Sequence, residues 1–158
     1  MSRAGGNPTR ITQSTGIDTE AKFTADGRTI YFVSDRGGGP QIYRQPVGGG
    51  NAERVTFNGA YNISPALSPD GKLLAYVARG SGFKVMVMNL ATGDVRSISD
   101  TEDDESPSFA PNGKFIIYAT QADGRDVLMT TTVDGKFKSR LLESGLDIRE
   151  PVWGPFGR

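Results

Sequence analysis

Carboxylates are the side chains of this sequence best suited to chemistry, and Glu20, Glu105 and Glu150 stand at or directly before the start of a repeated segment. Such groups can accept charge-assisted hydrogen bonds from the backbone or the basic side chains of a partner. They could equally be solvated loop acids. The sequence contains no His and no Cys, which excludes His-activated nucleophiles, thiolate chemistry and His/Cys zinc sites.

Two other uses of carboxylates are disfavoured by the residues around them. The acidic run 102–105 lacks the alternate-residue spacing and central Gly of a calcium-binding EF-hand loop, so a solvated loop that steers a partner is favoured. Paired carboxylates can hydrolyse glycosides. The sugar-binding clefts that do so usually show an aromatic platform, whereas Tyr31, Tyr76 and Tyr118 share one position of a repeat and indicate packing. We therefore predict no enzyme activity and no catalytic, cofactor or metal site.

The carboxylates belong to a repeat that runs through most of the chain. Four segments align without gaps, and the first three end in Asp-Gly or Asn-Gly: residues 20–27, 64–71, 106–113 and 150–157. Their large apolar position is occupied in turn by Phe23, Leu67, Phe109 and Trp153, at spacings of 44, 42 and 44 residues. Asp-Gly and Asn-Gly close hairpins because Gly accepts the left-handed conformation. The segments on either side are therefore predicted to pair as antiparallel strands.

The residues after each turn predict four strands per repeat. Continuous apolar runs come first and predict strands buried on both faces, over residues 29–33, 73–78 and 115–119. More polar third strands are expected at 41–44, 84–90 and 126–132, and short fourth strands at 54–56, 95–99 and 140–142. Four antiparallel strands with a polar outer edge, repeated at this period, are typical of a blade of a β-propeller. The predicted fold class is all-β.

The predicted domain organisation is a flexible N-terminus, residues 1–8, followed by a partial propeller over 9–158. Blades are expected at about 18–58, 62–100 and 104–143, with a terminal inner strand at 148–156. Residues 9–12 are interpreted as an outer strand with no earlier blade. The chain is thus expected to hold about three blades of a six-bladed ring, taken from a longer protein. An isolated half-ring would expose two blade faces or bury them by self-association.

Composition excludes two further classes of function. The chain has 18 Lys and Arg against 18 Asp and Glu, so it offers no broad basic surface, and nucleic-acid binding is not expected. The longest apolar run, residues 73–78, is far shorter than the ~20 residues that a membrane-spanning helix needs. The first ten residues lack the hydrophobic core of a signal peptide.

The sequence resembles the TolB family, the periplasmic propeller proteins of the bacterial Tol-Pal system, over residues 7–158. The resemblance is carried by the repeated E/S-P-x-W/F-x-P-D/N-G core, by Gly-Gly-Asn-Ala-Glu-Arg-Val-Thr at 49–56, and by Glu-Pro-Val-Trp-Gly-Pro-Phe at 150–156. It implies a non-catalytic scaffold that binds Pal, the peptidoglycan-associated lipoprotein, and other Tol proteins. It also implies roles in outer-membrane integrity and cell division. The parent protein is expected in the periplasm, although this chain itself carries no signal peptide.

The resemblance also implies a partner surface on the loops that lead into the innermost strands. A Thr-Glu pair of the family matches Thr19 and Glu20, although Ala21 and Phe23 stand where the family often has Pro and Trp. Together with the equivalent positions of the other repeats, the expected partner-binding residues are Thr19, Glu20, Asn62, Ser64, Asp104, Glu105, Arg149 and Glu150. Two alternatives remain: the gating propeller of a prolyl-oligopeptidase-like serine peptidase, and an isolated or engineered half-propeller that self-associates.

Overall fold

The computed structural model describes residues 5–144 and 147–154, and within these ranges it contains β-strands and no helix. The strands form three four-stranded antiparallel sheets, each built from four consecutive strands in sequence order. Blade 1 contains β1 (Asp18–Phe23), β2 (Thr29–Ser34), β3 (Gln41–Pro46) and β4 (Glu53–Arg54). Blade 2 contains β5 (Asn62–Leu67), β6 (Leu73–Arg79), β7 (Phe83–Asn89) and β8 (Val95–Ser97). Blade 3 contains β9 (Glu105–Phe109), β10 (Phe115–Ala122), β11 (Arg125–Thr132) and β12 (Lys138–Ser144).

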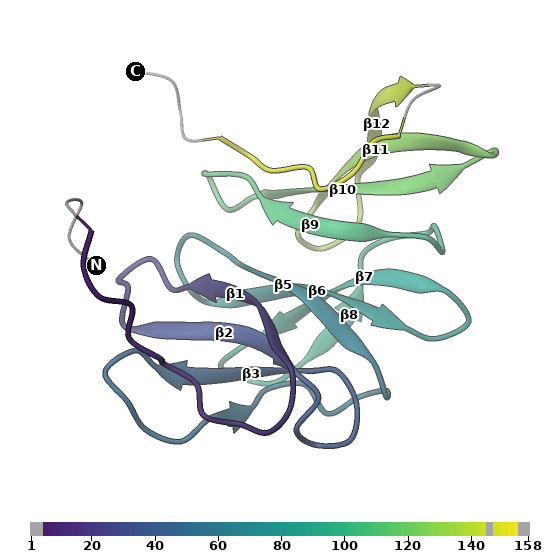
Figure 1. Ribbon diagram of the computed structural model, residues 1–158. Coiled ribbons are helices and arrows are strands. Elements are labelled where there is room, and N and C mark those ends of the chain that lie inside the picture. Colours follow the sequence, from purple (N-terminus) through teal and green to yellow (C-terminus); the bar gives the residue numbers. More distant parts are fainter. Residues whose placement is uncertain (1–4, 145–146, 155–158) are drawn as a thin grey trace.

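The three sheets follow one another in space as they do in the chain, with blade 2 between blades 1 and 3 (Figure 1). The inner strand β5 contacts both β1 and β9, so the first strands of the blades lie side by side. This arrangement confirms the expected all-β class and is that of part of a propeller. No helix suited to crossing a membrane occurs in the described part of the chain.

The hairpin between the first two strands of each blade has the conformation expected from Asp-Gly or Asn-Gly. Gly27, Gly71 and Gly113 have φ values of 68°, 71° and 69°, in the left-handed region. The preceding carboxylate or amide accepts a hydrogen bond from the backbone two residues later, as in Asp26 Oδ1 to Arg28 N at 3.0 Å. The turn residues therefore set the register of the inner hairpin in all three blades.

Two apolar cores lie between the blades. Leu74 and Tyr76 of β6 pack towards blade 1, whereas Ala75 of the same strand packs towards blade 3. Because neighbouring residues of a strand point to opposite faces, a middle blade needs a continuous apolar run, as its sequence predicts. Tyr31, Tyr76 and Tyr118 are all buried in these cores, which confirms their predicted packing role.

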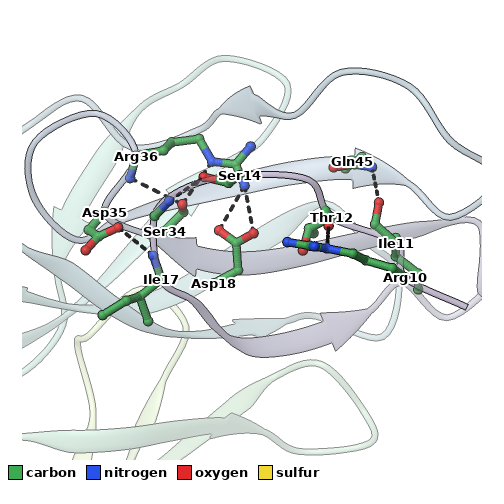
Figure 2. Close-up of polar contacts among 11 residues, drawn as sticks. Arg10, Ile11, Thr12, Ser14, Ile17, Asp18, Ser34, Asp35, Arg36 and Gln45 are labelled. Atoms are coloured by element: carbon green, nitrogen blue, oxygen red, sulfur yellow. Dashed lines mark hydrogen bonds and ion pairs between the residues drawn. The ribbon is translucent and has the colours of Figure 1, made fainter. Parts of the chain in front are cut away.

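The two expected orphan strands differ from prediction. Residues 9–12 form no strand, but Gln45 Nε2 donates to Ile11 O at 2.8 Å (Figure 2). Ile11 also packs against the cluster of Ile30, Phe32 and Tyr43. Residues 148–154 also form no strand, although Trp153 N donates to Ser108 Oγ at 3.2 Å. Residues 155 and 156 of that predicted strand, and 1–4 of the predicted N-terminus, lie outside the described residues. The segments 9–12 and 148–154 are not strands because an extended segment becomes a strand only when its backbone forms a ladder of hydrogen bonds with a neighbouring strand.

Candidate functional site

The inner strands share an irregularity at the position where the expected partner-binding residues lie. The pairing register shifts between Thr19 and Lys22 in β1, and between Ile63 and Ala66 in β5. A third shift occurs where β9 pairs with β10. The residues at this repeated position have left-handed φ values of 53°, 54°, 51° and 50°: Glu20, Ser64, Ser106 and Glu150. Left-handed backbone is uncommon for residues other than Gly, and β-bulges use it to redirect a side chain.

Glu20 connects the inner strands of two blades. Its Oε2 accepts a hydrogen bond from the backbone N–H of Ser64 at 2.5 Å. The two residues occupy the same position of consecutive repeats, so the contact fixes the bulge of β1 against that of β5. Thr19 and Glu20 are both exposed, and the carboxylate therefore stands at the surface while it holds the neighbouring strand.

Two of the expected residues, Asn62 and Asp104, lie behind this surface. Asn62 has no exposed area, and its Nδ2 donates to Gln41 Oε1 at 2.8 Å and to Asn58 O at 2.9 Å. Asp104 is 2% exposed; its Oδ2 accepts from Val85 N at 3.2 Å, and its other oxygen accepts from the Thr101 hydroxyl. Burial thus corrects the expectation that both side chains face a partner, because each instead holds the chain where it crosses between blades.

Asp18 occupies the same repeated position in blade 1 (Figure 2). Arg36 Nη2 donates to both of its carboxylate oxygens, at 2.8 and 2.9 Å, while the guanidinium lies 5.2 Å from the Phe32 ring centroid. Burial raises the pKa of Asp18, but hydrogen bonds from Ser34, Arg36 and Thr12 outweigh it and leave the pKa below its usual value. The carboxyl is therefore held ionised at the entrance to β1.

Sequence reasoning missed the hydroxyls that support these crossings. Thr56 Oγ1 accepts from Ile42 N at 3.0 Å, and Ser99 Oγ accepts from Val85 N at 3.0 Å. The signal that could have found them is a recurring aliphatic residue, Thr or Ser, and then Asp or Asn five or six positions later. It occurs at 11–18, 55–62 and 98–104. These residues are positioning residues, since they bind backbone rather than an external group.

Two hollows gather the remaining expected residues. A cavity of about 400 Å³ between blades 2 and 3 is lined in part by Ser64, Asp104, Glu105 and Arg149. A second hollow of about 520 Å³ runs along the inner strands and includes Glu20, Ser64 and Glu150. Thr19 and Asn62 line neither of the two. The structure therefore brings together six of the eight expected residues, with Ser64 where the hollows meet.

The acidic run 102–105 does not form one environment. Glu102 and Asp103 are exposed, Asp104 is buried and Glu105 is half-buried. Glu105 Oε2 lies 3.9 Å from Arg149 Nη1, which joins the start of β9 to the segment 147–154. Across 5–144 and 147–154, three or more potential metal-ligating side chains do not converge.

Comparisons with known proteins agree with this architecture. A family model described as the TolB beta propeller domain matches residues 1–157. The Tol-Pal system protein TolB of Bordetella pertussis is 54% identical over 155 residues, which cover 98% of this chain and 35% of that protein. The Nitrosospira multiformis protein of the same name is 53% identical over 120 residues, covering 73% of this chain and 28% of its own length. The chain thus spans about a third of these relatives.

Solved structures show the same relationship. The crystal structure of TolB from Acinetobacter baumannii superposes with a TM-score of 0.84 at 46% identity, over 92% of this chain and 37% of that one. An oligogalacturonate lyase in complex with manganese gives a TM-score of 0.67 at 17% identity, over 85% of this chain and 42% of that one, a likeness of fold alone. Both the matched family model and the identity to curated relatives show that the chain belongs to the TolB β-propeller family.

Proposed function

We propose that this chain is a segment of a Tol-Pal system component, a non-catalytic propeller whose mouth binds the lipoprotein Pal. The proposal includes a periplasmic location, contact with other Tol proteins, and roles in outer-membrane integrity and cell division. It is supported by the relatives named Tol-Pal system protein TolB and by the acidic residues Glu20 and Glu150 at the repeated left-handed position.

The observation that carries the proposal is the repeated left-handed position, which holds Glu20 in β1 and Glu150 in the segment 147–154. A side chain held by a fixed backbone loses less conformational freedom on binding than one on a free loop. The Ser64 N–H already orients the carboxylate of Glu20, which is exposed and can also accept a hydrogen bond from a partner.

The proposal is tested by calorimetry with this chain and the soluble domain of Pal. We expect Glu20→Gln to weaken binding by about 1–3 kcal/mol, because a charge-assisted hydrogen bond is lost. Glu53→Gln is the matched control, since Glu53 is an exposed glutamate of β4 that pairs with Arg44.

Unfolding curves of both variants separate a loss of binding from a loss of folding. Equal Pal affinity for the wild type and Glu20→Gln would remove Glu20 from the binding surface. A wild-type chain that does not bind Pal would contradict the proposed function for this segment.

A further inference from the structure

The cavity between blades 2 and 3 has an apolar wall. Ile63 and Val77 of blade 2 and Ala119 of blade 3 contribute aliphatic groups, and Tyr61 and Phe83 add two rings. The rings pack edge to face, with centroids 6.2 Å apart and planes inclined by 73°. The wall therefore offers an ordered surface against which an aliphatic chain can lie.

The remaining lining is acidic. It includes four carboxylates, those of Asp103, Asp104, Glu105 and Asp126, against the single guanidinium of Arg149. Arg149 is 63% exposed and stands 3.7 Å from Asp147 as well as 3.9 Å from Glu105, so its charge is shared at the rim. The cavity as a whole is complementary to a cation.

Two of the carboxylates are fixed by other groups. Asp126 accepts hydrogen bonds from Gln121 Nε2 at 3.1 Å and from the backbone N–H of Ile148 at 3.3 Å. Asp104 is held by Thr101 and by the backbone of Val85. Such preorganisation lowers the cost of ordering the site when a ligand enters.

A buried hydroxyl at the cavity has no protein partner. Thr120 is 3% exposed and lines the cavity, and its Oγ1 makes no hydrogen bond within the described residues. This atom has almost no accessible surface, so a group in the cavity cannot reach it, and the hydroxyl belongs to the buried side of the wall.

We infer that this cavity binds a lysine or arginine side chain carried by a protein partner. The aliphatic stem lies along Tyr61, Val77 and Phe83, and the cationic head reaches the carboxylates of Asp103, Glu105 and Asp126. An ammonium or guanidinium on an apolar stem matches both the wall and the charge, whereas a bare metal ion would leave the wall unused. The inference rests on the proposed function in one respect, that the mouth of the propeller is a protein-binding surface.

The test uses short peptides that differ at one side chain. Isotope-labelled chain is titrated with a Gly-Gly-Arg-Gly-Gly peptide and with its citrulline counterpart, and then with the corresponding lysine and norleucine pair. We expect the backbone amide NMR signals of residues 103–105, 120 and 126 to shift with the cationic peptides. Binding of the uncharged counterparts should be about fivefold weaker or more, because they lack the charge-assisted hydrogen bonds.

Variants identify the cavity as the site. Asp103→Asn should weaken binding of the cationic peptide, because it removes one negative charge from the cavity lining. Glu102→Gln is the matched control, because Glu102 is an exposed neighbour on the same loop outside the cavity lining. Equal binding of arginine and citrulline peptides would overturn the inference, as would an effect of Glu102→Gln equal to that of Asp103→Asn.

The peptide test is independent of Pal, so the two proposals can fail separately. If the cationic peptides shift the signals of the cavity residues but the chain does not bind Pal, the inference about the cavity is supported and the proposal that Pal is the partner is contradicted. Pal binding with no peptide response and no effect of Asp103→Asn would do the reverse.

Discussion

Tyr76 and Tyr118 carry phenol groups in the two cores that join the blades. Their exposed fractions are 1% and 0%. Burial raises the pKa of Tyr76 to about 12. Burial also raises the pKa of Tyr118 to about 12, with a further contribution from the nearby Asp104 carboxylate. Both residues therefore couple the contact between blades to pH.

We predict that the free energy of unfolding falls as pH rises from about 10 to about 12. In this window the unfolded chain has lost the phenol protons that the folded chain retains. Each rise of one pH unit therefore lowers the free energy of unfolding. Below the unfolded pKa the two states bind the same number of phenol protons, and this contribution is constant. Urea unfolding at a series of pH values measures the effect.

The control for this prediction is the double variant Tyr76→Phe, Tyr118→Phe. Its free energy of unfolding should fall less steeply over the same range, because the two buried phenols are removed. The decline that remains comes from lysines and the other groups, which are unchanged. A decline as steep as that of the wild type would assign the pH dependence to groups other than these two tyrosines.

At the residue scale, sequence patterns predicted which residues lie at the entrance positions, but not which of their side chains are buried. Glu20 lies only two repeat positions after the one that Asn62 occupies, yet Glu20 is exposed and Asn62 is fully buried. The difference arises from the bulge in each inner strand, which reverses the direction of the side chains that follow. Glu and Ser at a left-handed position give no signal of this conformation, whereas Gly would have done so.

At the scale of secondary-structure elements, the connection from blade 2 to blade 3 depends on one close approach between two backbone segments, residues 82–83 and 102–104. Phe83 N donates to Glu102 O at 2.5 Å, and Asp104 N donates to Phe83 O at 3.1 Å. A Cβ atom at Gly82 would lie 2.5 Å from Glu102 O and 2.7 Å from Glu102 Cβ. The hairpin between β6 and β7 therefore positions the loop that carries Asp104 and Glu105.

We predict that Gly82→Ala lowers the free energy of unfolding by about 1–3 kcal/mol, because the backbone of the crossing must move. Gly80→Ala is the matched control, since a Cβ atom there meets nothing within 4 Å in the same hairpin. Urea denaturation of both variants measures the difference. Equal free energies of unfolding for the two variants would show that the backbone near Gly82 accommodates a methyl group without loss of stability.

Strand order could be predicted from the sequence because its signals are local. The Asp-Gly and Asn-Gly turns and the apolar runs located β2, β6 and β10, and the structure places strands over all three runs. Residues 9–12 show the limit of this reasoning, since their pattern resembles an outer strand but no ladder forms. Pairing depends on a neighbour that the pattern of one segment does not contain.

At the scale of the whole molecule, blades 1 and 3 each present one face away from blade 2. Ile11 covers part of the outer face of blade 1. On β10 of blade 3, Ile116 and Tyr118 point towards blade 2, so Phe115 points to the opposite face and is 40% exposed. Phe137, which pairs with Thr132 next to Phe115, is 75% exposed. The outer face of blade 3 therefore exposes two neighbouring aromatic side chains.

We predict that this chain in isolation self-associates through the outer face of blade 3. Light scattering over a dilution series should give a mass that rises with concentration towards twice that of the monomer, because burying exposed aromatic surface is favourable. Phe115→Lys with Phe137→Lys should keep the chain monomeric.

Phe57→Lys is the control for self-association, since Phe57 is 70% exposed but lies against Arg54 of β4, on blade 1. A constant monomer mass for the wild type would contradict the prediction. So would an equal effect of Phe57→Lys and the double variant.

The left-handed bulge of the inner strands has a consequence for how such proteins diversify. Its φ value is nearly the same whether the residue is Glu or Ser: 53°, 54° and 51° at Glu20, Ser64 and Ser106. Each blade can therefore exchange one residue at the entrance while its hairpins and cores stay as they are. Natural selection could in this way change which molecules a propeller recognises, one blade at a time, without risking the architecture that all of them share.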